Sequence, residues 1–213
     1  MKHELKACLT PDQLEIFEAL TTPAKIQAFL DSLPYRVEDD THCPLYVMQD
    51  RRAHCLDGAL FAAAALSYLG YPPQLIDLFP EPGTDDDHVL AIYQYRGHYG
   101  ALAKSNYFTL RSREPIYRTL RELVLSYFEF DFNVDGIKTL RYYTQPLKLD
   151  RLDNLDWMCS DDHIPHLVEM LEHQRRYTLI TPEMAQALSP MDELSYRAGM
   201  YGVNLDGVYK PSR

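Results

Sequence analysis

The stretch QDRRAHCLDGALFAAAALSYLG, residues 49–70, decides how the rest of this chain is arranged. A polar, basic lead-in ends at Cys55, and the segment behind it consists mostly of Ala and Leu, which have high helix propensities. Gly70 follows the last apolar residue, as is typical of a helix that ends in a left-handed turn. The pattern predicts a buried helix that begins at or just before Cys55.

A cysteine at this position is a candidate nucleophile. The first N–H groups of a helix lack intrahelical partners and the helix dipole is positive at this end, so both would stabilise a thiolate at Cys55. Such surroundings lower a thiol pKa from about 8.5 to roughly 3.5–7.5. The alternative is that Cys55 is a small buried hydrophobic residue, as free cysteines often are.

Composition and charge limit the possible partners. The 213 residues are 46% hydrophobic, enough to bury the core of one domain, and we expect a single domain over residues 1–213. A formal net charge of −10 argues against nucleic-acid binding, which needs clustered basic residues. No apolar run approaches the length of a membrane span, so we also expect no membrane partner.

Cysteine usage and the first residues predict the compartment. The four cysteines, at positions 8, 43, 55 and 159, have no disulfide-rich spacing. The first twenty residues contain no uninterrupted apolar core of a signal peptide. Both features predict a cytoplasmic protein in reducing surroundings.

Helix and strand signals flank the central segment. A hydroxyl residue before a proline, a helix start signal, recurs at Thr10-Pro11, Thr22-Pro23, Thr181-Pro182 and Ser189-Pro190. Strands are expected over residues 74–79 and 137–143. A hairpin is expected over 88–104, where two strand-like runs flank Arg96-Gly97. Helical spacing returns from Ile116 to Phe128.

His88 is the candidate base for Cys55, because it opens a strand directly after a loop, where an imidazole is both fixed and accessible. The alternative is a surface histidine that the acidic run Asp85–Asp87 keeps protonated. A catalytic imidazole also needs a partner that orients its ring.

Two residues of the facing strand are candidates for that partner. If Tyr95 pairs with His98, then His88 falls opposite Ser105. Asn106 is one residue further, and a single bulge would bring its amide oxygen to the ring. Register favours Ser105 and chemistry favours Asn106; we choose Asn106 between the two.

The order of a helix-borne Cys, a strand with His and a polar residue on the next strand resembles the transglutaminase-like branch of the papain-like fold. The runs HCLDGALFAAAALSYLGYPPQLIDL and DDDHVLAIYQYRGHYGALAKSN are similar to the core of bacterial transglutaminase-like proteins. The resemblance covers about residues 20–145, with the catalytic-type motifs within 49–106. It leaves a C-terminal helical extension at about 146–213.

This resemblance implies roles for five residues. Cys55 would be the nucleophile, His88 its base, and Ser105 or Asn106 the third member of the site. Gln49 precedes Cys55 by six residues, which matches the papain-type spacing of an oxyanion-hole glutamine. That distance is short enough for its amide N–H to reach a developing oxyanion.

The expected fold is therefore α+β, with a papain/transglutaminase-like core in which the Cys-bearing helix packs on an antiparallel sheet between helical flanks. The expected function is hydrolysis or acyl transfer on a peptide or other amide, with water or an amine as acceptor and without a cofactor or metal. The alternative is a catalytically silent module of the same fold that binds a peptide or a protein partner.

Two other groups of residues could bind a metal. The repeated pairs His42-Cys43 and His54-Cys55 offer the ligand types of a zinc site, although neighbouring residues rarely both ligate one tetrahedral ion. His163, His166 and His173 share roughly one helical face. For these three we predict a solvated helix start.

Overall fold

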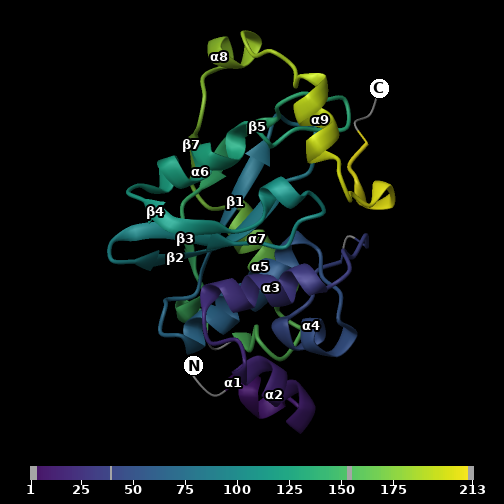
Figure 1. Cartoon of the computed structure of the whole chain (residues 1–213). Helices are drawn as coiled ribbons and strands as arrows, with labels where there is room; N and C mark the ends of the chain where they lie inside the picture. The colour runs from purple at the N-terminus through teal and green to yellow at the C-terminus, as the bar shows by residue number, and fades with distance from the viewer. Residues whose placement is uncertain (1–3, 39, 153–154, 211–213) are drawn as a thin grey trace.

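The computed structural model describes residues 4–38, 40–152 and 155–210. An antiparallel sheet lies between two groups of helices, with α3 and α5 on one side and α6 on the other (Figure 1). This arrangement confirms the expected α+β class. In the described ranges, no helix is long and apolar enough to cross a bilayer.

The α-helices follow the chain in nine segments of the described residues. They are α1 (Glu4–Cys8), α2 (Pro11–Glu18), α3 (Pro23–Ser32), α4 (Pro44–Asp50), α5 (Cys55–Tyr68), α6 (Leu120–Phe128), α7 (Ile164–Glu172), α8 (Pro182–Gln186) and α9 (Glu193–Gly199). Short 3-10 turns are η1 (Phe108–Leu110), η2 (Leu149–Arg151) and η4 (Leu205–Gly207).

Three of the four hydroxyl–proline pairs begin helices. Thr10, Thr22 and Thr181 are the N-caps of α2, α3 and α8, and each side chain accepts a hydrogen bond from an N–H of the first turn. The helix start predicted at Ser189-Pro190 is wrong. Helix α9 begins later because the carboxylate of Asp192 accepts the Ser195 N–H and supplies its cap.

The sheet has the strand order β4-β3-β2-β1-β5-β7, and β6 pairs with β1. The strands are β1 (Gln74–Pro80), β2 (His88–Tyr95), β3 (His98–Leu102), β4 (Arg113–Tyr117), β5 (Leu140–Thr144), β6 (Leu147–Lys148) and β7 (Arg176–Thr178). Tyr95 pairs with His98, so the predicted hairpin register is confirmed. Strand β3 ends at Leu102, earlier than the expected Lys104.

The helix predicted from Ile116 begins later than expected. Ile116 lies in β4 and is exposed, while α6 starts at Leu120 behind Thr119, whose side chain accepts the Glu122 N–H. Apolar residues on an edge strand and on the following helix happened to share a helical spacing, and the capping threonine decides the boundary.

Alternation along β2 divides the apolar core into two clusters. Val89, Ala91 and Tyr93 face the cluster around α5, whereas Leu90 and Ile92 face the cluster that contains α6. Successive side chains of a strand point to opposite faces, so a strand covered by helices on both sides is apolar throughout. This strand carries His88 at its first position, on the same face as Leu90 and Ile92.

Helix α5 begins and ends where the local signals predict. His54 is its N-cap: the ring Nδ1 accepts the Leu56 N–H, and the Asp57 carboxylate accepts the His54 N–H. Gly70 has φ 92°, a conformation that residues with a Cβ rarely adopt. Along the middle of the helix every side chain from Leu56 to Ser67 is buried. The helix is therefore a fixed platform for Cys55.

Cys8 in α1 and Cys159, just before α7, form a disulfide across 151 residues of sequence. The cysteine spacing did not predict this pair, because two isolated cysteines that far apart meet only through the tertiary fold. Cys43 and Cys55 are free. The cytoplasmic location was inferred partly from the cysteine spacing, and it stays a prediction.

Candidate active site

Cys55 lies at the junction of two cavities. It is the first residue of α5, and its side chain is partly exposed. One cavity, of about 50 Å³, is lined by Cys55 together with His88, Ser105 and Asn106. The other, of about 540 Å³, is lined by Cys55 and by residues of the loop before α4. Four residues singled out in the sequence thus line one small cavity.

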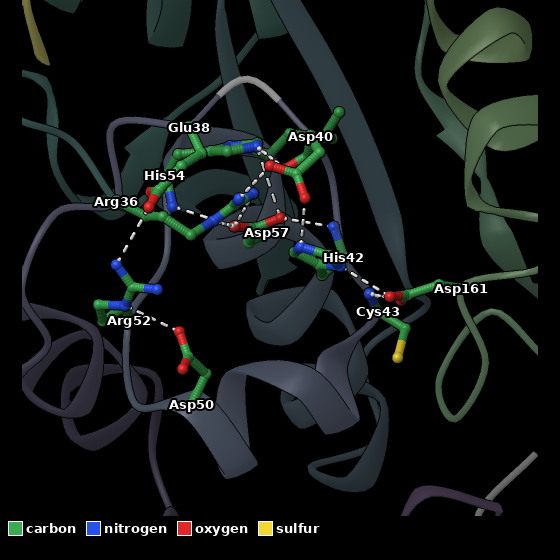
Figure 2. Close-up of polar contacts among 11 residues, drawn as sticks. Arg36, Glu38, Asp40, His42, Cys43, Asp50, Arg52, His54, Asp57 and Asp161 are labelled. Atoms are coloured by element: carbon green, nitrogen blue, oxygen red, sulfur yellow. Dashed lines mark hydrogen bonds and ion pairs between the residues drawn. The ribbon is translucent and has the colours of Figure 1, made fainter.

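A buried polar network fixes the start of α5 (Figure 2). Asp57, fully buried, accepts hydrogen bonds from Nε of Arg36 at 3.0 Å and from the His42 N–H at 2.8 Å. The guanidinium of Arg36 also contacts Asp40 at 2.6 Å. A charge-assisted network of this kind holds Arg36, Asp40 and His42 against the helix start. Cys55 is thereby presented from a rigid support.

Burial lowers the pKa of the His54 imidazole, so the ring is neutral. Its Nδ1 accepts the Leu56 N–H, and its Nε2 therefore carries the proton and donates to the carbonyl oxygen of Asp40 at 3.1 Å. His54 acts as a helix cap that ties the Cys55 turn to the preceding loop.

Tyr35 reaches Cys55 through a main-chain contact that no sequence pattern predicted. Tyr35 and Ala53 form a parallel bridge, and the Arg36 N–H donates to the Ala53 carbonyl at 3.1 Å. Tyr35 consequently lines both cavities beside Cys55. Burial raises the pKa of its phenol, so the hydroxyl stays protonated and is a hydrogen-bond donor.

His88 is held by the main chain. The ring is buried at the first position of β2, and Nε2 lies 2.8 Å from the carbonyl oxygen of Leu110. Burial lowers the pKa of His88 to about 4, so the ring is neutral at pH 7. A carbonyl only accepts, so Nε2 must carry the proton and Nδ1 keeps its lone pair.

The partners predicted for this ring are engaged elsewhere. Because β3 ends at Leu102, the chain leaves the sheet before the position opposite His88 is reached. The Ser105 hydroxyl accepts the Tyr107 N–H, and the Asn106 amide contacts the segment 204–207. The predicted orienting role of Asn106 or Ser105 is therefore corrected: that hydrogen bond goes to Leu110.

The Cys55 thiol has a raised pKa, opposite to the direction expected from its place on the helix. Burial is the main cause and the Asp87 carboxylate adds to it, while a hydrogen bond from the Val89 N–H works against both. A helix dipole contributes typically about 0.3–1 kcal/mol. Each unit of pKa shift corresponds to about 1.36 kcal/mol, and desolvation together with Asp87 outweighs the dipole here. Cys55 rests as a neutral thiol.

Gln49 lies in the last turn of α4 with an exposed side chain. Within the described part of the chain, neither of the two Cys55 cavities reaches it. The oxyanion role inferred from papain-type spacing is not supported by this position, because an intervening left-handed residue, Arg51, turns the chain between α4 and α5.

The small cavity also has an acidic side. Burial raises the pKa of Asp131 to about 7 and that of Asp85 to about 6. The Thr139 hydroxyl lies between them, 3.0 Å from Asp131 Oδ1 and 3.2 Å from Asp85 Oδ2. The hydrogen bonds from Thr139 favour the charged forms, but burial outweighs them, so both carboxyls are readily protonated near neutral pH.

The histidines considered as metal ligands have other contacts. The His42 ring contacts Asp161 at 2.7 Å and Asp40 at 2.8 Å, and the His54 ring caps α5. His163, His166 and His173 are exposed at or near the ends of α7, as a solvated helix start predicts. Among the residues that the structure describes, no group of three or more His, Cys, Asp or Glu side chains could hold a metal ion.

No protein-family model matches this chain, and no curated protein matches it. Among solved structures it is similar to Legionella pneumophila LapG, at 14% identity and a TM-score of 0.35 over 52% of this chain and 82% of that one. It is also similar to the EGTA-treated form of LapG, at 13% identity and a TM-score of 0.42 over 74% of this chain and 96% of that one. Neither likeness assigns an activity to this chain.

Proposed function

We propose that this protein is a transglutaminase-like cysteine hydrolase or acyltransferase that acts on an amide, with Cys55 as nucleophile and His88 as general base. The observation that carries the proposal is the shared cavity of Cys55 and His88, in which one ring nitrogen is fixed by Leu110 and the other keeps its lone pair. A nucleophile and an oriented base in one cavity are the minimum for acyl transfer.

The resting pair is neutral, so proton transfer accompanies attack. Nδ1 of His88 takes the thiol proton as Cys55 Sγ bonds to the amide carbon. The imidazolium then returns that proton to the nitrogen as the C–N bond breaks, which releases an amine and leaves a thioester on Cys55. Water or a second amine attacks the thioester and restores the thiol.

Two donors are placed for the oxyanion of this reaction. The N–H of Cys55 is at the first helical position, where the helix offers no partner for it. Tyr35, whose hydroxyl is protonated at neutral pH, lines the same cavity. Pre-oriented donors in a site with little water stabilise the developing charge more than water does.

The proposal is tested by acylation with p-nitrophenyl acetate, followed by peptide mapping of the acetylated residue. We expect acetyl transfer to Cys55 in the wild type, none in Cys55→Ser on this timescale, and a severe loss in His88→Gln. Cys43→Ser is the matched control, because Cys43 is also free but buried away from the cavity. Acetylation that is equally fast in His88→Gln would contradict the role of His88.

A second function has its own supporting observation. The Asn106 amide binds the main chain of residues 204–207 beside Cys55, as a peptide-binding module would bind its ligand. A silent module would bind such a segment and leave Cys55 unacylated. The same acetyl-transfer measurement therefore separates the two functions.

A further inference from the structure

The segment of residues 204–210 lies over the candidate site. Gly207 and Tyr209 line both the small and the large cavity at Cys55, and Lys210 lines the large one. This segment follows α9, the yellow end of the chain in Figure 1. The segment therefore forms part of the wall of both cavities at Cys55.

The side-chain amide of Asn106 bonds only to main-chain atoms of this segment. Its amide nitrogen donates to the carbonyl oxygens of Asn204 at 2.8 Å and Gly207 at 3.0 Å, and its amide oxygen accepts the Asn204 N–H at 2.8 Å. These three bonds enclose the single turn η4 and do not depend on the side chains of the segment. Asn106 is thus suited to bind the backbone of any peptide that can form the same turn.

One position of the segment requires glycine. A Cβ on Gly207 would lie 2.9 Å from Cγ1 of Val37 and 3.2 Å from the Tyr35 ring. Tyr35 and Val37 flank Arg36, which the Asp57 carboxylate holds in place. The groove therefore selects for glycine where the chain passes closest to Tyr35.

The charge of the large cavity favours a basic residue three positions after Gly207, at Lys210. The large cavity is lined by the carboxylates of Glu38, Asp86, Asp87 and Glu172, and by that of Asp206 in the segment itself. Lys210 lines the same cavity, whereas the one other cationic side chain on its wall within the described residues, Arg36, is already bound to Asp57. A cationic side chain at this end of a bound peptide lowers the repulsion among the carboxylates.

We propose that residues 204–210 are a built-in competitor for a peptide-binding groove at Cys55. The groove takes a peptide through main-chain contacts to Asn106, with glycine packed on Tyr35 and a basic residue three positions after it. The part of this inference that concerns the substrate rests on the proposed function. The part that concerns the segment covering Cys55 is independent of it.

The test compares the alkylation rate of Cys55 by iodoacetamide in the full-length chain. Gly207→Val should displace the segment and raise this rate several-fold. Leu205→Val is the matched control, because Leu205 is 63% exposed on the same turn, and its rate should equal that of the wild type. Cys43, buried in the core, should stay unlabelled in every variant and so reports that each variant is folded.

Asn106→Ala provides an independent route to the same result, with Ser105→Ala as its control. Only the first removes bonds to the segment, so only the first should speed labelling. Unchanged Cys55 rates in both Gly207→Val and Asn106→Ala would overturn the inference.

A synthetic peptide of residues 203–210, VNLDGVYK, added in excess to the Gly207→Val protein, should return Cys55 labelling to the slow wild-type rate. The same peptide carrying Gly207→Val should not. No slowing by the first peptide would overturn the substrate part of the inference. Faster labelling of the variants without acetyl transfer to Cys55 would refute the proposed function and support the role of residues 204–210 as competitor. Acetyl transfer to Cys55 with unchanged labelling would support the proposed function and refute the competitor.

Discussion

Nε2 of His88 lies 2.8 Å from the carbonyl oxygen of Leu110, so the ring that faces the Cys55 cavity is oriented by the main chain of η1. A carbonyl that only accepts fixes the tautomer as firmly as a side-chain amide oxygen does. It also adds no negative charge that would raise the pKa of the ring. Burial outweighs the effect of this hydrogen bond on His88 and also raises the pKa of the Cys55 thiol, so both groups are neutral at rest.

The neutral pair has a kinetic signature. The pKa of His88 is lowered to about 4 and that of the Cys55 thiol is raised, so the fraction of thiolate should grow steadily through the alkaline range. We expect the alkylation rate of Cys55 to rise with pH beyond the value of about 8.5 typical of a free thiol. Stopped alkylation and peptide mapping across pH measure this, with Cys55→Ser as the blank. A plateau that begins in the acidic range would instead indicate a thiolate–imidazolium pair.

Asp131 should make stability depend on pH. Its pKa is about 7 in the folded chain because of burial, against about 3.9 unfolded, so its folded state favours the protonated form. This contribution is fully present below the unfolded pKa and is lost as the pH rises through 7. We expect Asp131→Asn to be more stable than the wild type above neutrality, by on the order of 1–4 kcal/mol, and this gain to vanish in acid.

Urea unfolding of both proteins at acidic and alkaline pH measures this difference. The comparison isolates Asp131, because the lowered pKa of His88 acts in the opposite direction in both proteins and destabilises the fold as the pH falls below the unfolded value of about 6.5. Asp135→Asn is the control, since Asp135 is exposed four residues away. A difference between Asp131→Asn and the wild type that is the same at every pH would show that folding does not shift the pKa of Asp131.

Local signals were enough to predict the frame of the site. The start of α5 at Cys55, the left-handed Gly70 and the pairing of Tyr95 with His98 all depend on residues close together in sequence. Capping and turn preferences are local effects, so they can be read from short stretches.

The remaining parts depend on contacts between distant residues. Leu110 contributes a carbonyl, which every residue has, so no side-chain pattern indicates it. Asn106 was chosen for its amide, and that amide instead binds Asn204, 98 residues later. The direction of the Cys55 pKa was wrong for the same reason, because it depends on burial by the whole fold and by Asp87.

The disulfide between Cys8 and Cys159 should carry a large share of the stability. It closes a loop of about 150 residues, and chain entropy alone assigns such a cross-link roughly 4–5 kcal/mol. We expect the Cys8→Ser, Cys159→Ser double variant to unfold at a clearly lower urea concentration than the oxidised wild type. Cys43→Ser serves as the comparison for a free cysteine. Equal midpoints for the oxidised wild type and the double variant would mean that the two thiols are unlinked in solution.

The last prediction concerns the hydroxyl of Tyr35, which lines the cavity beside Cys55 and stays protonated because burial raises its pKa. Removal of one oxyanion donor typically lowers kcat by roughly 10²–10³. We therefore expect Tyr35→Phe to reduce the rate of acetyl transfer to Cys55 by about this factor, with little change in KM, because the ring and its packing against Gly207 are kept.

Tyr107→Phe is the matched control. Tyr107 lines the same cavity, and burial likewise raises its pKa, but it lies after β3 and so belongs to neither the helix of Cys55 nor the strand of His88. Saturation kinetics of both variants with p-nitrophenyl acetate give the two parameters separately. An equal fall in kcat in the two variants would indicate a general effect on the cavity. A rise in KM alone would place Tyr35 in substrate binding and not in stabilisation of the oxyanion.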